Sequence, residues 1–144
     1  MTTSGAGGQG RGQPTAAPPL VAIVDDDASV RRSTGRLIRS FGYRAEEFAS
    51  GEEFLASQVA ARAACLVLDV RMPNMDGLEV QGELTARHLH VPVVFISGRA
   101  SDDEERRARV AGAFAFLRKP LAAATLLAVL QTAVPRGAQH EDDA

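Results

Sequence analysis

The sequence predicts a one-domain α/β protein in which a five-stranded parallel sheet carries helices on both faces, in a doubly wound (βα)5 order. Short apolar runs alternate with longer segments of helical periodicity, five times in succession. Most of these runs are apolar throughout, which is typical of parallel strands covered on both faces. The chain has 144 residues, a length that suits one domain with a single sheet.

Five segments are expected to form the strands. The second, YRAEEFA, carries several charges, so we place it near an edge of the sheet. The fourth, VPVVFIS, has a proline at its start, where a strand tolerates one. In chain order, the expected strands cover residues 20–24, 43–49, 64–70, 91–97 and 113–117.

A helical pattern follows each strand. In the first helix, apolar residues recur at helical spacing until Gly42 ends the pattern. Ser50 with Glu53, and Ser101 with Glu104, match the capping boxes that begin helices. The expected helices lie within residues 28–42, after Ser50, within 76–88, after Ser101 and within 121–134.

The third and fourth expected helices differ in how many residues can face the sheet. Leu78 and Leu84 are expected to face inward from the third helix. The fourth helix, DDEERRARVAG, is more charged than a helix half buried against a sheet. It is therefore predicted to be short and marginally stable, a candidate for an element that moves. Its only expected inward residues are Ala108, Val110 and Ala111.

The two ends of the chain and its overall composition narrow the function classes. Residues 1–19 and 135–144 have too few large apolar side chains to fold, so we expect a disordered arm and a disordered tail. The net charge of −2 gives no indication of nucleic acid or membrane as partners. No apolar run is long enough to span a bilayer, and residues 1–19 lack the apolar central region of a signal peptide, so a cytoplasmic location is expected. The single cysteine, Cys65, is expected to be a buried apolar residue.

Polar residues stand where four of the expected strands end. In an open parallel sheet, ligands bind outside the carboxyl ends of the strands, so these residues should converge. Carboxylates suit Mg²⁺, while a hydroxyl and an ammonium group can hold phosphoryl oxygens. The sequence thus predicts a site for a divalent cation and a phosphoryl group. The residues concerned are Asp25, Asp26, Asp27, Asp69, Ser97 and Lys119.

Each of these residues also has a purely structural explanation. An aspartate after the first strand can cap the following helix, and Asp27 is the expected cap. Asp69 could cap a turn, Ser97 could simply end a strand, and Lys119 could be a solvated surface residue. It is their occurrence at successive strand ends, rather than any one of them, that favours a functional site.

Four motifs, IVDDD, LVLDVRMPNMDG, FISG and RKP, occur in this order and spacing. In this respect residues 20–134 resemble the receiver domain of bacterial response regulators, the phosphorylated module of two-component signalling. The resemblance implies a flavodoxin-like fold. Only ten residues follow Val134, and they contain no DNA-binding motif, so a stand-alone, single-domain receiver is expected.

The resemblance also implies a role for each site residue. Asp69 is the expected phosphoacceptor, Ser97 the switch hydroxyl and Lys119 the lysine that contacts the phosphoryl group. Phe116 is the expected aromatic switch, although many family members have tyrosine there, and its alternative is an ordinary core residue. The peptide bond before Pro120 is expected to be cis. The Mg²⁺ ligands would be Asp26 and Asp69, Asp25 through water, and the backbone carbonyl of Arg71.

The implied function is that of a phosphoacceptor in a phosphorelay. A histidine kinase or histidine phosphotransfer protein would donate a phosphoryl group to Asp69 in the presence of Mg²⁺, and the receiver would signal through protein contacts. Such a protein is not an enzyme beyond catalysing its own phosphorylation and dephosphorylation. Two alternatives stay open here: a haloacid dehalogenase-like phosphatase using Asp25 and Asp27, and a pseudo-receiver that is never phosphorylated.

Two arginines flank the expected route of water to an acyl phosphate. Arg71 and Arg99 lie two residues after Asp69 and Ser97, respectively. A guanidinium group can bind phosphoryl oxygens but cannot accept a proton from water. We therefore expect the pair to prolong the life of the phosphorylated state, unless both side chains simply point into solvent.

Overall fold

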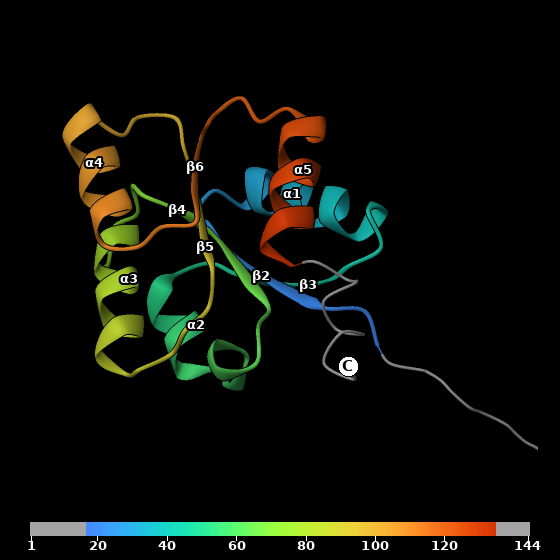
Figure 1. Cartoon of the computed structure of the whole chain (residues 1–144), viewed down its shortest axis with the longest axis horizontal. Helices are drawn as coiled ribbons and strands as arrows, with labels where there is room; N and C mark the ends of the chain where they lie inside the picture. The colour runs from blue at the N-terminus through green and yellow to red at the C-terminus, as the bar shows by residue number, and fades with distance from the viewer. Residues whose placement is uncertain (1–16, 135–144) are drawn as a thin grey trace, which may run out of the picture.

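The computed structural model describes residues 17–134 (Figure 1). The predicted arm and tail fall almost entirely outside these residues. Within them, five strands alternate with five α-helices and one short 3-10 helix. The strands are β2 (Leu20–Val24), β3 (Arg44–Phe48), β4 (Cys65–Asp69), β5 (Val93–Ser97) and β6 (Ala115–Arg118). The helices are α1 (Ala28–Ser40), α2 (Gly51–Ala56), η2 (Gln58–Ala61), α3 (Gly77–Ala86), α4 (Asp102–Val110) and α5 (Ala123–Ala133).

The five strands form one parallel sheet in the order β3-β2-β4-β5-β6. The predicted fold class is therefore confirmed, and the charged strand β3 lies at an edge as expected. The strand order reverses between β2 and β4, because β3 pairs with one side of β2 and β4 with the other. This arrangement brings the carboxyl ends of β2 and β4 side by side, which is where the site residues follow.

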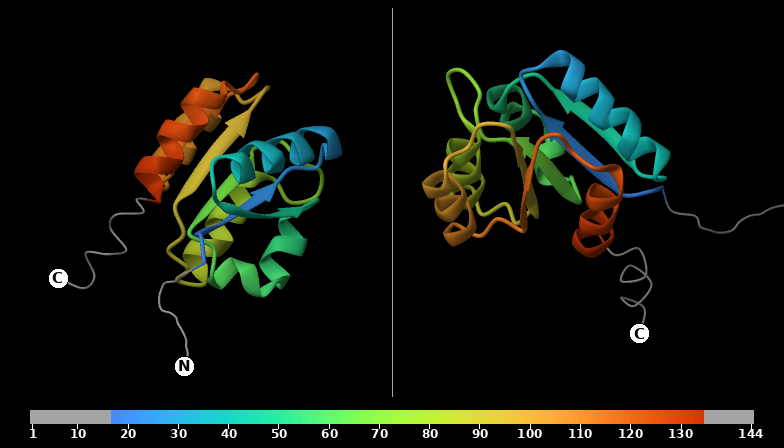
Figure 2. Two further views of the ribbon diagram at one scale, coloured as in Figure 1. Left: turned by 90° about the vertical axis from the view of Figure 1, so that its right-hand side faces the viewer. Right: turned by 90° about the horizontal axis from the view of Figure 1, so that it is seen from above.

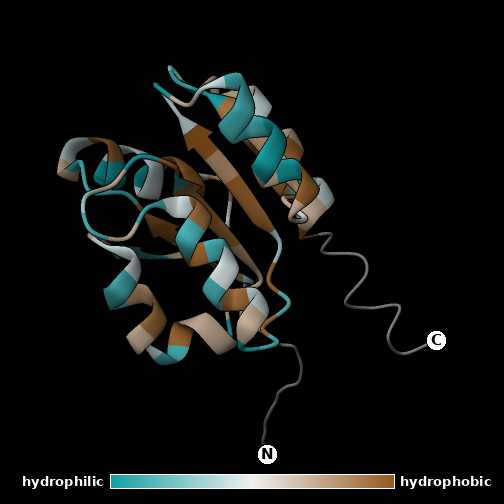
Figure 3. Ribbon diagram, turned by 90° about the vertical axis from the view of Figure 1, so that its left-hand side faces the viewer, coloured by the Kyte–Doolittle hydropathy of each residue, from teal (hydrophilic) through white to brown (hydrophobic). Residues whose placement is uncertain are grey.

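Helices cover both faces of the sheet (Figure 2). Alternate strand residues, such as Leu66 and Phe95, pack on one face against α2, α3 and α4. The intervening residues, such as Val67 and Ile96, pack on the other face against α1 and α5. The strands are mostly apolar in Figure 3, whereas the helices combine apolar and polar surfaces. Cys65 is buried among the apolar residues, and desolvation raises the pKa of its thiol to about 12.

Side-chain caps fix where the helices begin. Asp27 Oδ1 accepts from the backbone N–H groups of Ser29 and Val30 and so caps α1, as predicted. Ser101 and Glu104 form the predicted capping box of α4. The second predicted box is incomplete, because Ser50 caps α2 but the carboxylate of Glu53 accepts from Ala49 rather than from Ser50.

A capping box that was not predicted begins α3. Asp76 Oδ1 accepts from the N–H of Glu79 at 2.9 Å, and Glu79 Oε1 accepts from the N–H of Asp76 at 2.9 Å. The next residue, Gly77, packs so closely on the end of β4 that a Cβ atom there would overlap the carbonyl oxygen of Asp69. The start of α3 is thus held directly beside the end of β4.

The inward face of α4 is narrower than predicted. Ala108 is buried, as expected, but Val110 is 82% exposed and Ala111 is also exposed. The prediction for these two residues was wrong because α4 ends at Val110, whose side chain points away from the sheet. Instead, neighbouring α3 covers part of α4, and the buried side chain of Gln81 donates to the carbonyl oxygen of Ala108. In α3, Leu84 is buried as expected, while Leu78 is only partly buried.

Truncating Val110 and Val80 to alanine should distinguish these environments. Val80→Ala removes two methyl groups from a fully buried site in α3 and should lower the free energy of unfolding by about 2 kcal/mol. Val110→Ala should change it by less than about 0.5 kcal/mol, since the side chain is exposed and alanine favours helix. Chemical denaturation of both variants measures the difference. An equal loss of stability would contradict the outward placement of Val110.

The two prolines that precede β2 form hydrogen bonds with β3. The carbonyl oxygens of Pro18 and Pro19 accept hydrogen bonds from Arg44, through its side-chain Nε and its backbone N–H, respectively. These contacts place the residues just before β2 beside β3. Among residues 17–134, no helix is long and apolar enough to cross a membrane.

Candidate phosphorylation site

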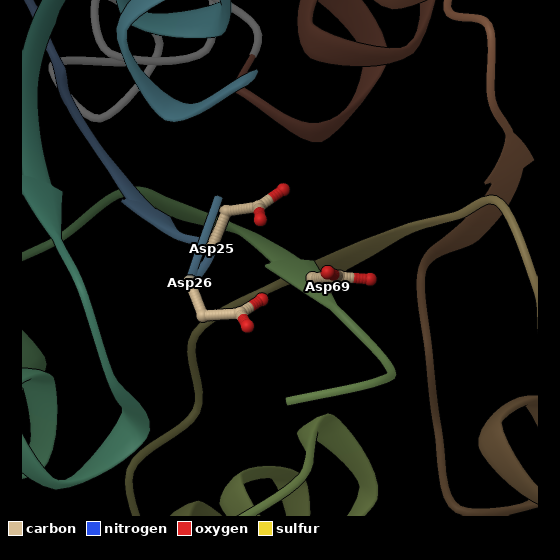
Figure 4. Close-up of side chains that lie close together, drawn as sticks. All are labelled: Asp25, Asp26 and Asp69. Atoms are coloured by element: carbon tan, nitrogen blue, oxygen red, sulfur yellow. The ribbon is translucent and has the colours of Figure 1, made fainter. Parts of the chain in front are cut away.

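Three carboxylates come together at the carboxyl ends of β2 and β4. Asp25 and Asp26 directly follow β2, and Asp69 is the last residue of β4 (Figure 4). One oxygen atom from each carboxylate lies within 4.8 Å of the others. Three negative charges at this spacing repel one another, so the arrangement favours a bound cation. The acidic cluster predicted from the strand ends is therefore present.

Asp25 and Asp26 differ sharply in environment. Asp25 is fully buried; its Oδ1 accepts from the N–H of Asp27 at 2.9 Å and its Oδ2 from Lys119 Nζ at 3.2 Å. Its carbonyl oxygen also accepts from Arg31 Nη1 at 2.8 Å. Asp26 is exposed, and within residues 17–134 no hydrogen bond or ion pair to its carboxylate is found. Asp26 is thus the carboxylate with free coordination capacity, and Asp25 the one already engaged.

Lys119 reaches this cluster from the residue after β6. Its Nζ lies 3.2 Å from Asp25 Oδ2 and 3.6 Å from Asp69 Oδ2. Burial alone would lower the pKa of Lys119, but the charges of Asp69 and Asp25 outweigh that effect and raise it. The backbone N–H of Lys119 donates to the carbonyl oxygen of Ser97 at 2.9 Å, and its peptide bond to Pro120 is cis. The ammonium group of Lys119 therefore lies beside both Asp25 and Asp69.

Asp69 has an unusual acidity. It is 6% exposed, and desolvation raises its pKa from 3.8 to about 6, with the charge of Asp25 acting in the same direction. Lys119 and the backbone N–H of Arg71 oppose this rise without cancelling it. Ionisation of Asp69 in the folded protein is therefore energetically unfavourable, and a cation bound in the cluster would reduce this free-energy cost.

This cost predicts a gain of stability when the charge is removed. Because the folded-state pKa of Asp69 lies above the unfolded value, the group favours folding at low pH and loses that contribution as the pH rises through about 6. In EDTA at neutral pH, Asp69→Asn should therefore raise the free energy of unfolding by about 1 kcal/mol. The gain should vanish toward pH 4. Asp27→Asn, which retains a capping side chain, should show no such pH-dependent gain in the same denaturation series.

Ser97 lies at the end of β5, next to Asp69 at the end of β4 in the sheet. It is fully buried, and its Oγ accepts from the N–H groups of Arg99 at 3.2 Å and Ala100 at 2.9 Å. The hydroxyl oxygen thus anchors the loop between β5 and α4. Its proton is still available to donate to an acceptor in the pocket.

Phe116 is buried in the middle of β6. It is 6% exposed, and its ring centroid lies 5.7 Å from that of Phe95. The guanidinium carbon of Arg118 lies 5.3 Å from the centre of the Phe116 ring. Arg118 also donates to the carbonyl oxygen of Ala100, in the loop that Ser97 anchors. Phe116 therefore occupies an inward position, and its switching role stays a prediction.

A cavity of about 420 Å³ lies over the acidic cluster. Asp26, Asp69, Ser97 and Lys119 line it, together with Arg71 and Arg99. The side chain of Arg71 is not simply solvated, because its Nη2 forms an ion pair with Glu104 Oε1 at 2.8 Å. Sequence reasoning missed Glu104 as a neighbour of the site, since its capping role gave it a sufficient local explanation.

Comparison with known proteins identifies the class. Residues 21–131 match the model of the response regulator receiver domain, and the chain belongs to that family. It is 37% identical to Nodulation protein W of Bradyrhizobium diazoefficiens, over 94% of this chain and 60% of that protein. It is 38% identical to the response regulator protein TmoT of Ectopseudomonas mendocina, over 87% of this chain and 57% of that protein. The chain thus spans less than two thirds of the length of these relatives.

Solved structures agree with this assignment. The response regulator StyR superposes with a TM-score of 0.77 and 38% identity, over 88% of this chain and 64% of that one. A response regulator receiver protein from Burkholderia phymatum superposes with a TM-score of 0.70 and 39% identity, over 81% of this chain and 94% of that one. The described chain is therefore a receiver domain of two-component signalling, and a receiver domain is not a classical enzyme, which sets aside the phosphatase alternative for it.

Proposed function

We propose that Asp69 is the phosphoacceptor of this receiver and that it takes a phosphoryl group from a phosphohistidine on a histidine kinase or histidine phosphotransfer protein. The observation that carries this proposal is the convergence of Asp69 with two further carboxylates and Lys119 at one rim of the sheet. This arrangement has a nucleophile, a fixed cation and acidic metal ligands in one cavity. A pseudo-receiver would need none of these groups to be kept together.

The acidic cluster fits Mg²⁺. Its donors are carboxylate oxygens, and the exposure of Asp26 leaves room for the water ligands that Mg²⁺ retains. Asp26 and Asp69 would hold the ion with the backbone carbonyl of Arg71, and Asp25 would contribute through water. When bound, the ion would neutralise charge on the transferring phosphoryl group.

The residues of the chain supply the remaining chemistry. A carboxylate oxygen of Asp69 attacks phosphorus, the bond between phosphorus and the donor imidazole nitrogen breaks, and an acyl phosphate forms. The donor ring carries a proton on its other nitrogen and therefore leaves as neutral imidazole. Lys119, 3.6 Å from Asp69 Oδ2, pairs with a phosphoryl oxygen. The hydroxyl of Ser97 donates to another oxygen once the group is in place. Phosphorylation then alters the β5–α4 loop that this hydroxyl anchors.

A neighbouring hollow supports a protein as the phosphoryl donor. Between α1 and the segment after β6 lies a cavity of about 400 Å³ with largely apolar walls, including Leu37, Ile96 and Leu121. It shares Val30 and Lys119 with the cavity over the acidic cluster. A donor helix carrying phosphohistidine could pack into this hollow while presenting its phosphoryl group to Asp69. A small phosphodonor needs only the acidic cavity.

Labelling with two kinds of donor tests this function. Incubation with acetyl phosphate and Mg²⁺ should add one phosphoryl group, seen by intact mass spectrometry, and the adduct should be hydrolysed in both acid and base, as an acyl phosphate is. Ser33 is exposed and lines the hollow, so Ser33→Glu should slow transfer from a phosphorylated histidine kinase and leave labelling by acetyl phosphate unchanged. Absence of any adduct with either donor would favour the pseudo-receiver. Equal slowing with both donors would contradict the docking role of the hollow.

A further inference from the structure

Arg71 connects the candidate phosphorylation site to helix α4. Its backbone follows Asp69 by two residues, and its N–H lies 3.4 Å from Asp69 Oδ1. Its guanidinium group reaches α4 instead, where Nε and Nη2 donate to Glu104 Oε1 at 3.2 and 2.8 Å. One side chain thus joins two segments that are 33 residues apart in the sequence.

Glu104 is a firmly held partner for this arginine. The same oxygen, Oε1, accepts from the N–H of Ser101 at 2.9 Å and so completes the capping box of α4. The side chain is only 19% exposed. The hydrogen bond from the N–H of Ser101 lowers the pKa of Glu104, and the side chain of Arg71 lowers it further, so the carboxylate is ionised at neutral pH. Glu104 is therefore fixed by the N–H of Ser101 as well as by Arg71, although the side chain of Arg71 is 53% exposed.

Arg71 also borders the place where a phosphoryl group would stand. It lines the cavity over Asp69 and also a second cavity, which Glu104 and Asp76 border. A phosphoryl group carries close to two negative charges and several acceptor oxygens, whereas Glu104 carries one charge. Guanidinium groups bind phosphoryl oxygens in a bidentate manner. The two acceptors consequently compete for one cation.

We propose that Glu104 is a positioning residue that holds the guanidinium group of Arg71 away from phosphorylated Asp69 and thereby shortens the life of the aspartyl phosphate. This inference rests on Asp69 being the phosphoacceptor. Conversely, phosphorylation draws Arg71 off Glu104 and removes one contact between the loop after β4 and the first turn of α4. The coupling is reciprocal, because the pair and the phosphorylated state each weaken the other.

Hydrolysis explains why the position of Arg71 affects lifetime. Water attacks phosphorus, the bond between phosphorus and the Asp69 oxygen breaks, and inorganic phosphate and a proton leave, which restores the carboxylate. A guanidinium group bound to the phosphoryl oxygens occupies the approach of water and cannot accept its proton. An arginine retained by Glu104 leaves that approach more open.

Two neighbouring glutamates of α4 offer a matched pair of variants. Glu104→Gln removes the charge that retains Arg71, and glutamine can still complete a capping box. Glu105→Gln is the control, because the carboxylate of Glu105 pairs with Arg109 and Arg118 and not with Arg71. After removal of acetyl phosphate, Glu104→Gln should lose its phosphoryl group about threefold more slowly than wild type. Glu105→Gln should lose it at the wild-type rate.

A double variant separates positioning from a general effect on α4. In an Arg71→Met background, Glu104→Gln should no longer change the lifetime, because the group it acts through is gone. A purely structural role of Glu104 would persist in that background. The proposal is overturned if Glu104→Gln matches wild type, or if its effect survives the loss of Arg71.

A spectroscopic measurement tests the competition directly. The Nε–H proton of Arg71 should change its NMR frequency when the full chain is phosphorylated by acetyl phosphate and Mg²⁺. The Nε–H of Arg109, which donates to Glu105 Oε2 at 3.1 Å, is an internal reference that should not move. If Asp69 is labelled and the Arg71 signal stays in place, only the competition is refuted. If Asp69 is never labelled, the proposed function is refuted with it.

Discussion

Replacing Asp69 with asparagine should reduce phosphorylation by acetyl phosphate and Mg²⁺ to background, a loss of at least about a hundredfold in rate. The amide has nearly the same shape as the carboxylate but lacks the anionic oxygen that attacks phosphorus. The fold should survive, because Asp69→Asn removes a charge from a crowded acidic cluster. Intact mass spectrometry over a time course measures the effect.

Asp27→Asn is the matched control for this prediction. Asp27 also follows β2, but its side chain caps α1, a role that asparagine fulfils equally well. This variant should label at the wild-type rate. Labelling of Asp69→Asn at the wild-type rate would show that another residue is the acceptor, and peptide mapping of the adduct would locate it.

Asp26→Ala should lower the affinity for Mg²⁺ at least tenfold, about 1.4 kcal/mol, while the protein stays folded. Asp26 is exposed and its carboxylate is the uncommitted member of the cluster, so its removal costs no buried contact. It also relieves the repulsion on Asp25 and Asp69. Mg²⁺ should raise the thermal unfolding midpoint of the wild type and have little effect on the variant.

Asp27→Ala serves as the control here. It removes the cap of α1, at a cost of about 1 kcal/mol, and should leave Mg²⁺ binding unchanged. NMR titration with Mg²⁺ gives the affinities independently of stability. An unchanged affinity in Asp26→Ala would contradict the assignment of Asp26 as a direct ligand.

Patterns that are local in the chain could be predicted from it. Strands buried on both faces require continuous apolar runs, and right-handed crossovers place successive carboxyl ends at one rim, so the cluster of Asp25, Asp26 and Asp69 was predictable. The capping box of Ser101 and Glu104 spans one helical turn and could equally be predicted from the sequence. That of Asp76 and Glu79 has the same local signature and was overlooked.

The tertiary structure alone decided three other features. The charged sequence of α4 offers several small or apolar residues but does not decide among them; Ala108 is buried as expected, whereas only packing against α3 and the sheet determined that Val110 is exposed. Asp25 and Asp26 are identical in chemistry, but Asp25 is buried and accepts hydrogen bonds from Asp27 and from Lys119, 94 residues away, whereas Asp26 is exposed and its carboxylate is open. The pairing of Arg71 with Glu104 likewise joins the loop after β4 to the first turn of α4. Sequence periodicity determines which residues reach the rim, but the contacts between side chains there depend on loop conformations that no local pattern encodes.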